Sequence, residues 1–321
     1  MSIRSFAIAL VVLATATTAP VVAAQQKFKS PEAAVEALQK AAESGDPNQF
    51  DKLLGSAYRD FHAGQQADAP LAKARLDRFA KAMKEFRSVG GEGESRIVYV
   101  GAEGWPFPVP IVRSGNGWAF DGAAGVEELR NRIVGANELN AIAVLGAYGD
   151  AQREYALEDH DGDGVIEYAQ RFGSSAGAQD GLYWDDAADD PEGLRSPLGP
   201  LIALAEQAMG QRAAGEPFLG YRFRILTSQG AGGKTGAYDY VVGGNMVGGY
   251  AAIAWPAKYG DTGVQTFVVN QDAVVYQRDL GDDTEAQVQA ITRFEPGDGW
   301  QAVDDDSLLG DVRTAGQPSP R

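Results

Sequence analysis

Residues 137–155 read NELNAIAVLGAYGDAQREY, and the apolar spacing of this stretch organises the expected architecture. Its apolar side chains recur three and four positions apart, at Ala141, Val144, Leu145, Tyr148, Ala151 and Tyr155. That spacing puts them on one face of a helix, with Arg153 and Glu154 off the face. The pattern predicts one long helical region over 126–159, and Gly135 is a candidate interruption near its start.

Downstream of this helix the chain changes character twice. An acidic, glycine-rich stretch over 159–195 predicts irregular structure, and a short helix is expected over 198–211. Apolar runs bounded by Gly, Asp and Asn then predict five strands, over 221–227, 238–242, 250–255, 264–269 and 274–278. Residues 304–321 have little apolar content and are predicted to be a disordered tail.

Upstream, helices again precede strands. Ser30 followed by Pro31 and Glu32 predicts a helix start, and Gly45 predicts its end. Further helices are expected over 47–54 and 71–86, and strands over 97–100, 109–112 and 118–120, the last after a hairpin turn at 114–117. The predicted class is α+β, with a small module of helices plus antiparallel sheet over 25–124 and a larger domain over 125–303.

The first 24 residues have the features of a cleavable secretory signal. Arg4 precedes an apolar core at 6–13, and small residues end the stretch at 22–24, which predicts cleavage before Gln25. A retained membrane anchor is the alternative, but the apolar run falls short of the roughly 20 residues that span a bilayer. No second stretch is apolar enough to span, so the mature protein is expected to be soluble, and the cleaved signal predicts the periplasm or the extracellular space.

The net charge and the cysteine content limit which molecules the protein can bind and which reactions it can catalyse. Without residues 1–24, which contain one basic residue, 27 Lys and Arg face 44 Asp and Glu, so the net charge is −17. Such a chain is repelled by nucleic acid and by anionic membrane surfaces, and it favours divalent cations or basic partners. The absence of cysteine excludes disulfides, thiol chemistry and cysteine-ligated metals.

The acidic stretch contains the most specific local motif, DHDGDGVIE at 159–167. Asp159, Asp161 and Asp163 alternate before a Gly turn, and the Val165 carbonyl and Glu167 follow at the next two ligand positions of an EF-hand loop. Gln170 stands where that loop has its bidentate Glu. Two interpretations stay open: a calcium site that uses these five residues, or an Asp/Gly turn with solvated carboxylates.

The remaining motifs give little catalytic chemistry. GAGGKTG at 230–236 resembles a phosphate loop, but Ser228 stands where the first Gly belongs and the loop lies between two expected strands. His62 and His160 lack an evident serine partner, so we assign no catalytic residue and no organic cofactor. Tyr183 and Trp184 lie in a polar loop and are candidates for an interaction site, or alternatively a plug that fixes the loop on the sheet.

Six motifs together are similar to those of a known family. They are DAQREY at 150–155, DGDGVIEYAQ at 161–170, DGLYW at 180–184, SPLGPL at 196–201, GYRFRIL at 220–226 and AWPAKYG at 254–260. They resemble the bacterial exported proteins grouped as domain of unknown function 2950. The resemblance covers nearly the whole chain after the signal. It implies an exported protein of a Gram-negative-type cell and names no reaction.

The order of elements after 137 is similar to the globular head of type IV pilins, in which an antiparallel sheet packs on a long helix. A pilin begins with a fibre-forming apolar helix, whereas this chain has an ordinary signal and about 100 intervening residues. The expectation is therefore a soluble, non-enzymatic structural or interaction protein of the cell envelope that binds an unidentified protein or glycan. The alternative is a periplasmic hydrolase or carbohydrate-binding protein that uses acidic residues and Tyr183-Trp184.

Overall fold

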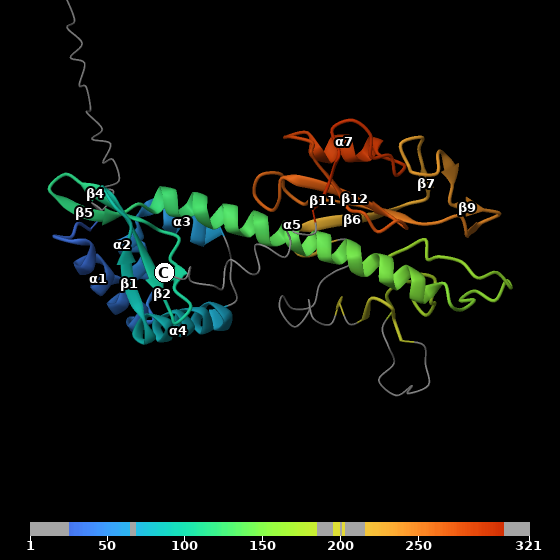
Figure 1. Ribbon diagram of the computed structural model, residues 1–321. Helices are drawn as coiled ribbons and strands as arrows, with labels where there is room; N and C mark the ends of the chain where they lie inside the picture. Colours follow the sequence, from blue (N-terminus) through green and yellow to red (C-terminus); the bar gives the residue numbers. More distant parts are fainter. Residues whose placement is uncertain (1–25, 65–68, 185–194, 200, 203–215, 305–321) are drawn as a thin grey trace, which may run out of the picture. The chain divides into compact units, whose positions relative to one another are not determined.

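The computed structural model describes residues 26–64, 69–184, 195–199, 201–202 and 216–304 (Figure 1). The predicted signal at 1–24, most of the predicted helix at 198–211 and nearly all of the predicted tail at 304–321 lie outside these residues. The chain divides into two compact units between Val126 and Glu127, and each unit has its own hydrophobic core.

The first unit begins with helix α1 (Pro31–Ser44), whose ends are those expected from the sequence. The Ser30 hydroxyl accepts a hydrogen bond from the Ala33 amide at 3.3 Å, and Gly45 closes the helix at φ 65°. Glycine suits this left-handed position because it has no Cβ to clash with the backbone. The apolar stripe of α1 packs against α2 (Pro47–Leu54) and α4 (Ala69–Glu85).

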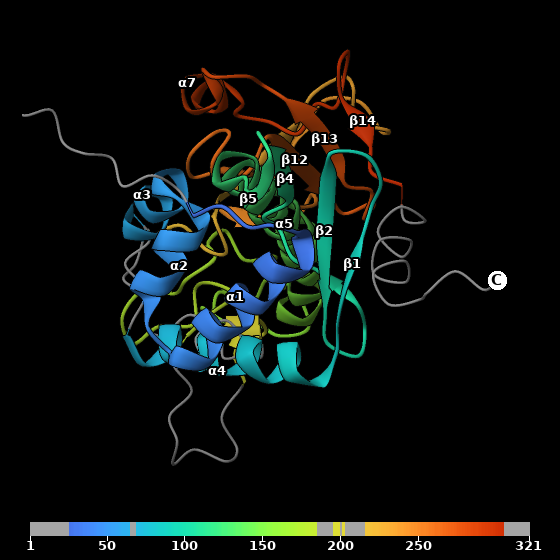
Figure 2. The ribbon, with the colours of Figure 1, turned by 90° about the vertical axis from the view of Figure 1, so that its left-hand side faces the viewer.

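A further helix in this unit, α3 (Ser56–Gly64), was not predicted from the sequence. Its residues, SAYRDFHAG, have no extended apolar stripe and only the aromatic Tyr58 and Phe61 as large apolar groups. Contacts with α2 and with the unit's core therefore hold a segment whose own sequence signal is weak. Figure 2 shows α1, α2 and α4 gathered beside the ribbon of β1 (Arg87–Gly90) and β2 (Ser95–Val100).

An antiparallel sheet completes the first unit, with strand order β1-β2-β4-β5 and β3 paired with β2. Its strands are β1 (Arg87–Gly90), β2 (Ser95–Val100), β3 (Trp105–Pro106), β4 (Ile111–Ser114) and β5 (Gly117–Phe120). The strand expected over 109–112 begins only at Ile111, because Pro108 and Pro110 have no amide hydrogen to pair. The hairpin turn at 114–117 is confirmed by the Ser114–Gly117 pairing.

Helix α5 (Gly122–Tyr155) is longer at its start than predicted and shorter at its end. Gly135 does not interrupt it, and a Cβ at that position would meet nothing within 4 Å. The predicted face is confirmed, since Ala141, Val144, Leu145, Tyr148, Ala151 and Tyr155 are all buried. Among the described residues, no helix combines the length and apolar character needed to cross a membrane.

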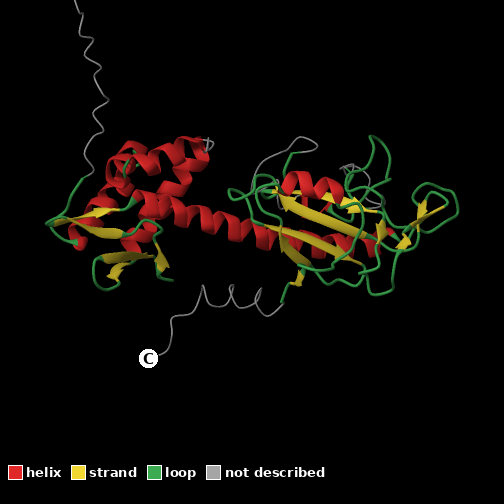
Figure 3. Cartoon of the chain, turned by 90° about the horizontal axis from the view of Figure 1, so that it is seen from above, coloured by secondary structure: helices red, strands yellow, loops and turns green. Residues whose placement is uncertain are grey.

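The second unit contains an antiparallel sheet of order β14-β13-β12-β11-β6. Its strands are β6 (Tyr221–Leu226), β11 (Ala251–Pro256), β12 (Gln265–Asn270), β13 (Tyr276–Asp279) and β14 (Gln301–Ala302). Helix α5 covers one face, where Tyr148 donates a hydrogen bond to the Ala251 carbonyl at 3.0 Å. The unpredicted helix α7 (Thr284–Ala290) covers the other face (Figure 3), and Trp255 donates to its Glu285 at 2.8 Å.

Two small hairpins project from this unit. One pairs β7 (Ser228–Gln229) with β8 (Tyr238–Asp239), and the other pairs β9 (Val241–Val242) with β10 (Asn245–Met246). The single strand predicted over 238–242 is thus divided between two hairpins. The chain combines helices with antiparallel sheets throughout its described residues, so the predicted α+β class is confirmed.

Candidate functional site

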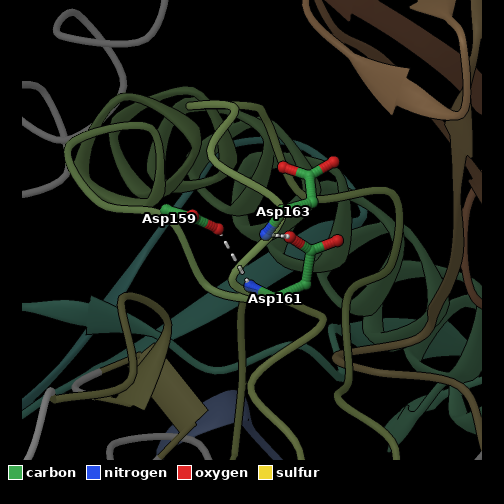
Figure 4. A group of neighbouring side chains, drawn as sticks. All are labelled: Asp159, Asp161 and Asp163. Carbon is green, nitrogen blue, oxygen red and sulfur yellow. Dashed lines mark hydrogen bonds between the residues drawn. The ribbon is translucent and has the colours of Figure 1, made fainter.

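The chain leaves α5 at Tyr155 and enters the acidic loop, residues 159–167. One carboxylate oxygen each from Asp159, Asp161 and Asp163 lies within 4.8 Å of the other two (Figure 4). The turn is folded by carboxylates that accept backbone amides: Asp161 Oδ1 accepts from Asp163 at 3.1 Å, and Asp163 Oδ1 accepts from Val165 at 2.7 Å. All three carboxylates are exposed, so an ion from solution can reach them.

Asp159 is the most strongly bonded of the three carboxylates. Its oxygens accept the amides of Gly164 at 2.8 Å, Gly162 at 2.7 Å and Asp161 at 3.3 Å. The Gly164 amide first, and then Gly162, hold the pKa of Asp159 below its usual value, because both bonds favour the charged carboxylate. The loop therefore gathers ionised oxygens, the ligand type that hard divalent cations prefer.

A buried glutamine ties the loop's exit to α5. Gln152 is fully buried on α5; its Nε2 donates to the Ala169 carbonyl at 2.8 Å, and its Oε1 accepts the Ala169 amide at 2.8 Å. The same Nε2 lies 3.1 Å from the Tyr148 hydroxyl. These bonds satisfy both backbone groups of a buried residue 17 positions away, so they fix where the loop rejoins the core.

Aromatic stacking fixes the loop's entry. The His160 ring stacks on Tyr155 with centroids 3.9 Å apart, and it lies 5.9 Å from the Trp184 ring. Burial, with the nearby carboxylates of Glu167 and Asp180 next in effect, raises the pKa of Tyr155 to about 12. His160 Nε2 lies 3.0 Å from the Tyr155 carbonyl, while its Nδ1 is buried without a hydrogen-bond partner among the described residues.

The β9–β10 hairpin supports the outer side of the loop. Asn245 Nδ2 donates to Asp163 Oδ2 at 2.6 Å, and the Met246 amide donates to Glu167 Oε2 at 2.8 Å. Tyr168 donates its amide to the Met246 carbonyl at 2.9 Å. The acidic loop is thus held by α5, which directly precedes it, and by a hairpin about 80 positions further along the chain.

Comparison with known proteins places the chain in a family. Residues 25–303 match the family described as "Protein of unknown function (DUF2950)". The chain belongs to the DUF2950 family. No curated protein and no solved structure matches this DUF2950 chain, and the predicted similarity to pilin heads stays a prediction.

In this DUF2950 protein, the five candidate calcium ligands do not all gather. The three aspartates come together, whereas Glu167 has its Oε2 engaged by the Met246 amide. Gln170, at the position of the missing bidentate Glu, donates instead to the Gly244 carbonyl at 2.6 Å. Val165 is 37% exposed and donates its amide to Asp163. The structure therefore brings three exposed carboxylates together, while the Val165 carbonyl and Glu167 stay predicted ligands.

The two aromatic candidates are half-buried and pack against the core of the second unit. The Tyr183 amide donates to the Phe172 carbonyl at 2.8 Å, and the Trp184 amide donates to Ser196 Oγ at 3.3 Å. Tyr183 also lines a cavity of about 390 Å³ with mainly apolar walls, among them Phe172, Leu198 and Phe223. This packing matches a plug that fixes the loop more closely than an open platform for a sugar ring.

The phosphate-loop lookalike folds as a turn. Residues 230–236 connect β7 to β8, and Gly233 and Gly236 donate to carbonyls within the turn. A Cβ on Gly230 would lie 2.3 Å from the carboxyl carbon of Glu295, so this acidic side chain sits directly against the loop. Its negative charge disfavours the binding of phosphate there. Gln152 and Asn245 were missed as site residues, because their partners lie 17 and 82 positions away and no local spacing indicates them.

Proposed function

We propose that this chain is an exported, non-enzymatic interaction protein of the cell envelope whose acidic loop binds calcium. The convergence of Asp159, Asp161 and Asp163 within 4.8 Å carries the calcium part. Three ionised carboxylates this close repel one another, and a divalent cation between them removes that repulsion. The secretory pattern of residues 1–24 motivates the export part.

Calcium suits the arrangement better than magnesium. Calcium accepts six to eight oxygen ligands in flexible geometry and tolerates several waters, whereas magnesium demands near-ideal octahedral geometry. The loop offers three carboxylates, and water completes the shell on its exposed side. With Gln170 in place of a bidentate Glu, we expect a dissociation constant of about 10⁻⁴ to 10⁻³ M, the range of extracellular calcium modules.

Thermal unfolding with and without calcium tests the proposal. At about 10 mM calcium, that affinity stabilises the folded state by about 1.4 to 2.7 kcal/mol. The melting temperature should then rise by about 3 to 10 °C over the value with chelator. The double variant Asp161→Asn with Asp163→Asn should lose the rise, and the matched control Asp282→Asn, on an exposed acid outside the loop, should keep it.

An unchanged melting temperature for the unaltered protein would overturn the calcium assignment. The interaction part has a separate test: capture from envelope extracts with the purified protein as bait, followed by identification of what is retained. Retention of defined protein partners supports it, whereas retention on glycan with turnover of that glycan would support the competing hydrolase or carbohydrate-binding function.

A further inference from the structure

Exposed aliphatic side chains surround the acidic loop and have no part in the calcium proposal. Val165 and Ile166 in the loop are 37% and 51% exposed, and Val242 and Val247 on the hairpin are 61% and 43% exposed. We call these four residues the apolar patch. Aliphatic groups that gather on a surface and are rimmed by polar residues are typical of a site for another molecule.

The patch forms one surface because hydrogen bonds join the two segments that carry it. Tyr168, just after the loop, pairs antiparallel with Met246 of β10, and Gln170 Nε2 reaches the Gly244 carbonyl at 2.6 Å. The hairpin and the loop lie side by side at the same end of α5 (Figure 1). Residues 165 and 166 therefore lie in the segment, between Asp163 and Glu167, that the hairpin binds at both ends.

The register of the hairpin sets the direction of its valines. Val242 is the cross-strand partner of Asn245, so both side chains lie on one face, and the Asn245 amide on that face reaches Asp163. Met246 is fully buried, whereas the next residue, Val247, is 43% exposed. The exposed Val242 thus lies on the face of the hairpin whose Asn245 contacts the loop.

The two segments that carry the patch contain acidic residues and no basic ones. Residues 154–170 contain six acidic residues and no Lys or Arg, and residues 237–249 contain only Asp239 as a charged residue. The same sign dominates the unit, since residues 127–321 have 14 Lys and Arg against 31 Asp and Glu. A partner that covers the aliphatic groups must therefore bring positive charge to the acidic rim.

We propose that the apolar patch binds a basic segment of a partner protein that alternates aliphatic and cationic side chains. This proposal rests on the interaction function above and names its surface and the chemistry of its partner. Aliphatic side chains would cover Ile166 and Val242, while lysine or arginine would face the loop's carboxylates. The patch has no aromatic platform or array of hydrogen-bonding groups of the kind that glycans need, and its charge repels anionic lipids and nucleic acids.

Fluorescence anisotropy with labelled synthetic peptides tests the proposal on the full protein in chelator. The probe is a short peptide of leucine and lysine; one control replaces each leucine by serine, and another replaces each lysine by glutamate. We expect the leucine-lysine peptide to bind at least about tenfold more tightly than either control, because both apolar burial and charge contribute.

Matched protein variants locate the binding surface. Ile166→Ser with Val242→Ser should weaken binding of the leucine-lysine peptide about tenfold, and Val274→Ser, on a valine 39% exposed outside the patch, should leave it unchanged. Val242→Ser alone should give a smaller loss in the same direction, and it guards against misfolding of the double variant. Equal binding by the double variant, or by the serine-lysine peptide, would overturn the proposal.

The outcome is distinguishable from that of the calcium test. Calcium-dependent melting without peptide binding overturns the patch assignment and leaves the calcium site standing. Peptide binding without any calcium effect supports the patch and removes only the calcium part of the function.

Discussion

Replacing Gln152 by leucine should destabilise the second unit more than any exposed substitution. Leucine has a similar volume, but it leaves the buried amide and carbonyl of Ala169 without the two bonds, each 2.8 Å, that they now make. Each buried group left unsatisfied costs about 1 to 3 kcal/mol, so the expected loss is about 2 to 5 kcal/mol after the apolar gain of leucine.

The assay is urea unfolding followed by circular dichroism, with Gln289→Leu on an exposed position of α7 as the matched control. The control should stay within about 0.5 kcal/mol of the unaltered protein. Gln152→Leu should also weaken calcium binding, because the loop's exit is no longer fixed to α5. A variant as stable as the control would refute the claim that Gln152 holds the loop on the core.

Three further perturbations follow from local geometry. Gly220→Ala should lower the free energy of unfolding by about 2 to 4 kcal/mol, because φ is 81° and the new Cβ would lie 2.3 Å from Asn137 Nδ2. The control Gly177→Ala, at φ 76° with nothing within 4 Å of the new Cβ, should lower it by only about 1 kcal/mol in the same urea assay. Glu138→Ala removes the acceptor for the amides of Val264 at 2.8 Å and Gln265 at 3.0 Å, so a melting scan should show a loss of about 2 to 3 kcal/mol. A hydrogen bond from the Ser175 amide lowers the pKa of Asp180 in the folded protein below its unfolded value of about 3.9. The ionised carboxylate therefore stabilises the fold at any pH above about 3.9, and this stabilisation is lost as the pH falls through the lower, folded pKa. The stability gap between the unaltered protein and Asp180→Asn should therefore close as the pH of the melting scans is lowered below about 4; a gap that persists there would contradict this origin.

The spacing of apolar residues predicted the elements that have a complete apolar face. The stripe from Ala141 to Tyr155 was readable because every member is buried, and α1 was readable because Ser30 and Gly45 mark its ends. Helices α3 and α7 are short, and their sequences have few apolar positions, so contacts outside each helix decide their structure. Strand β1 reads RSVG and has a single aliphatic residue, and β3 has only two residues, so neither shows an alternating pattern.

For the candidate site, the sequence indicated the aspartates and missed what positions them. Asp159, Asp161 and Asp163 alternate around glycines, and this local spacing indicated a calcium site or a turn with solvated carboxylates; the structure places one oxygen of each within 4.8 Å of the others. The engagement of Glu167 by the Met246 amide depends on a hairpin 79 positions away, which local spacing cannot reveal. The same distance hides the apolar patch, since its four residues come from two segments.

Terbium luminescence tests the central claim, a calcium site in the acidic loop, most directly. Trp184 lies near the loop through its contact with His160, so terbium held by the three aspartates should be excited through tryptophan, and calcium should displace it. We expect a saturable signal that calcium removes and that Asp161→Asn with Asp163→Asn abolishes. A signal that is absent from the unaltered protein, or that is unchanged in the double variant, would contradict it.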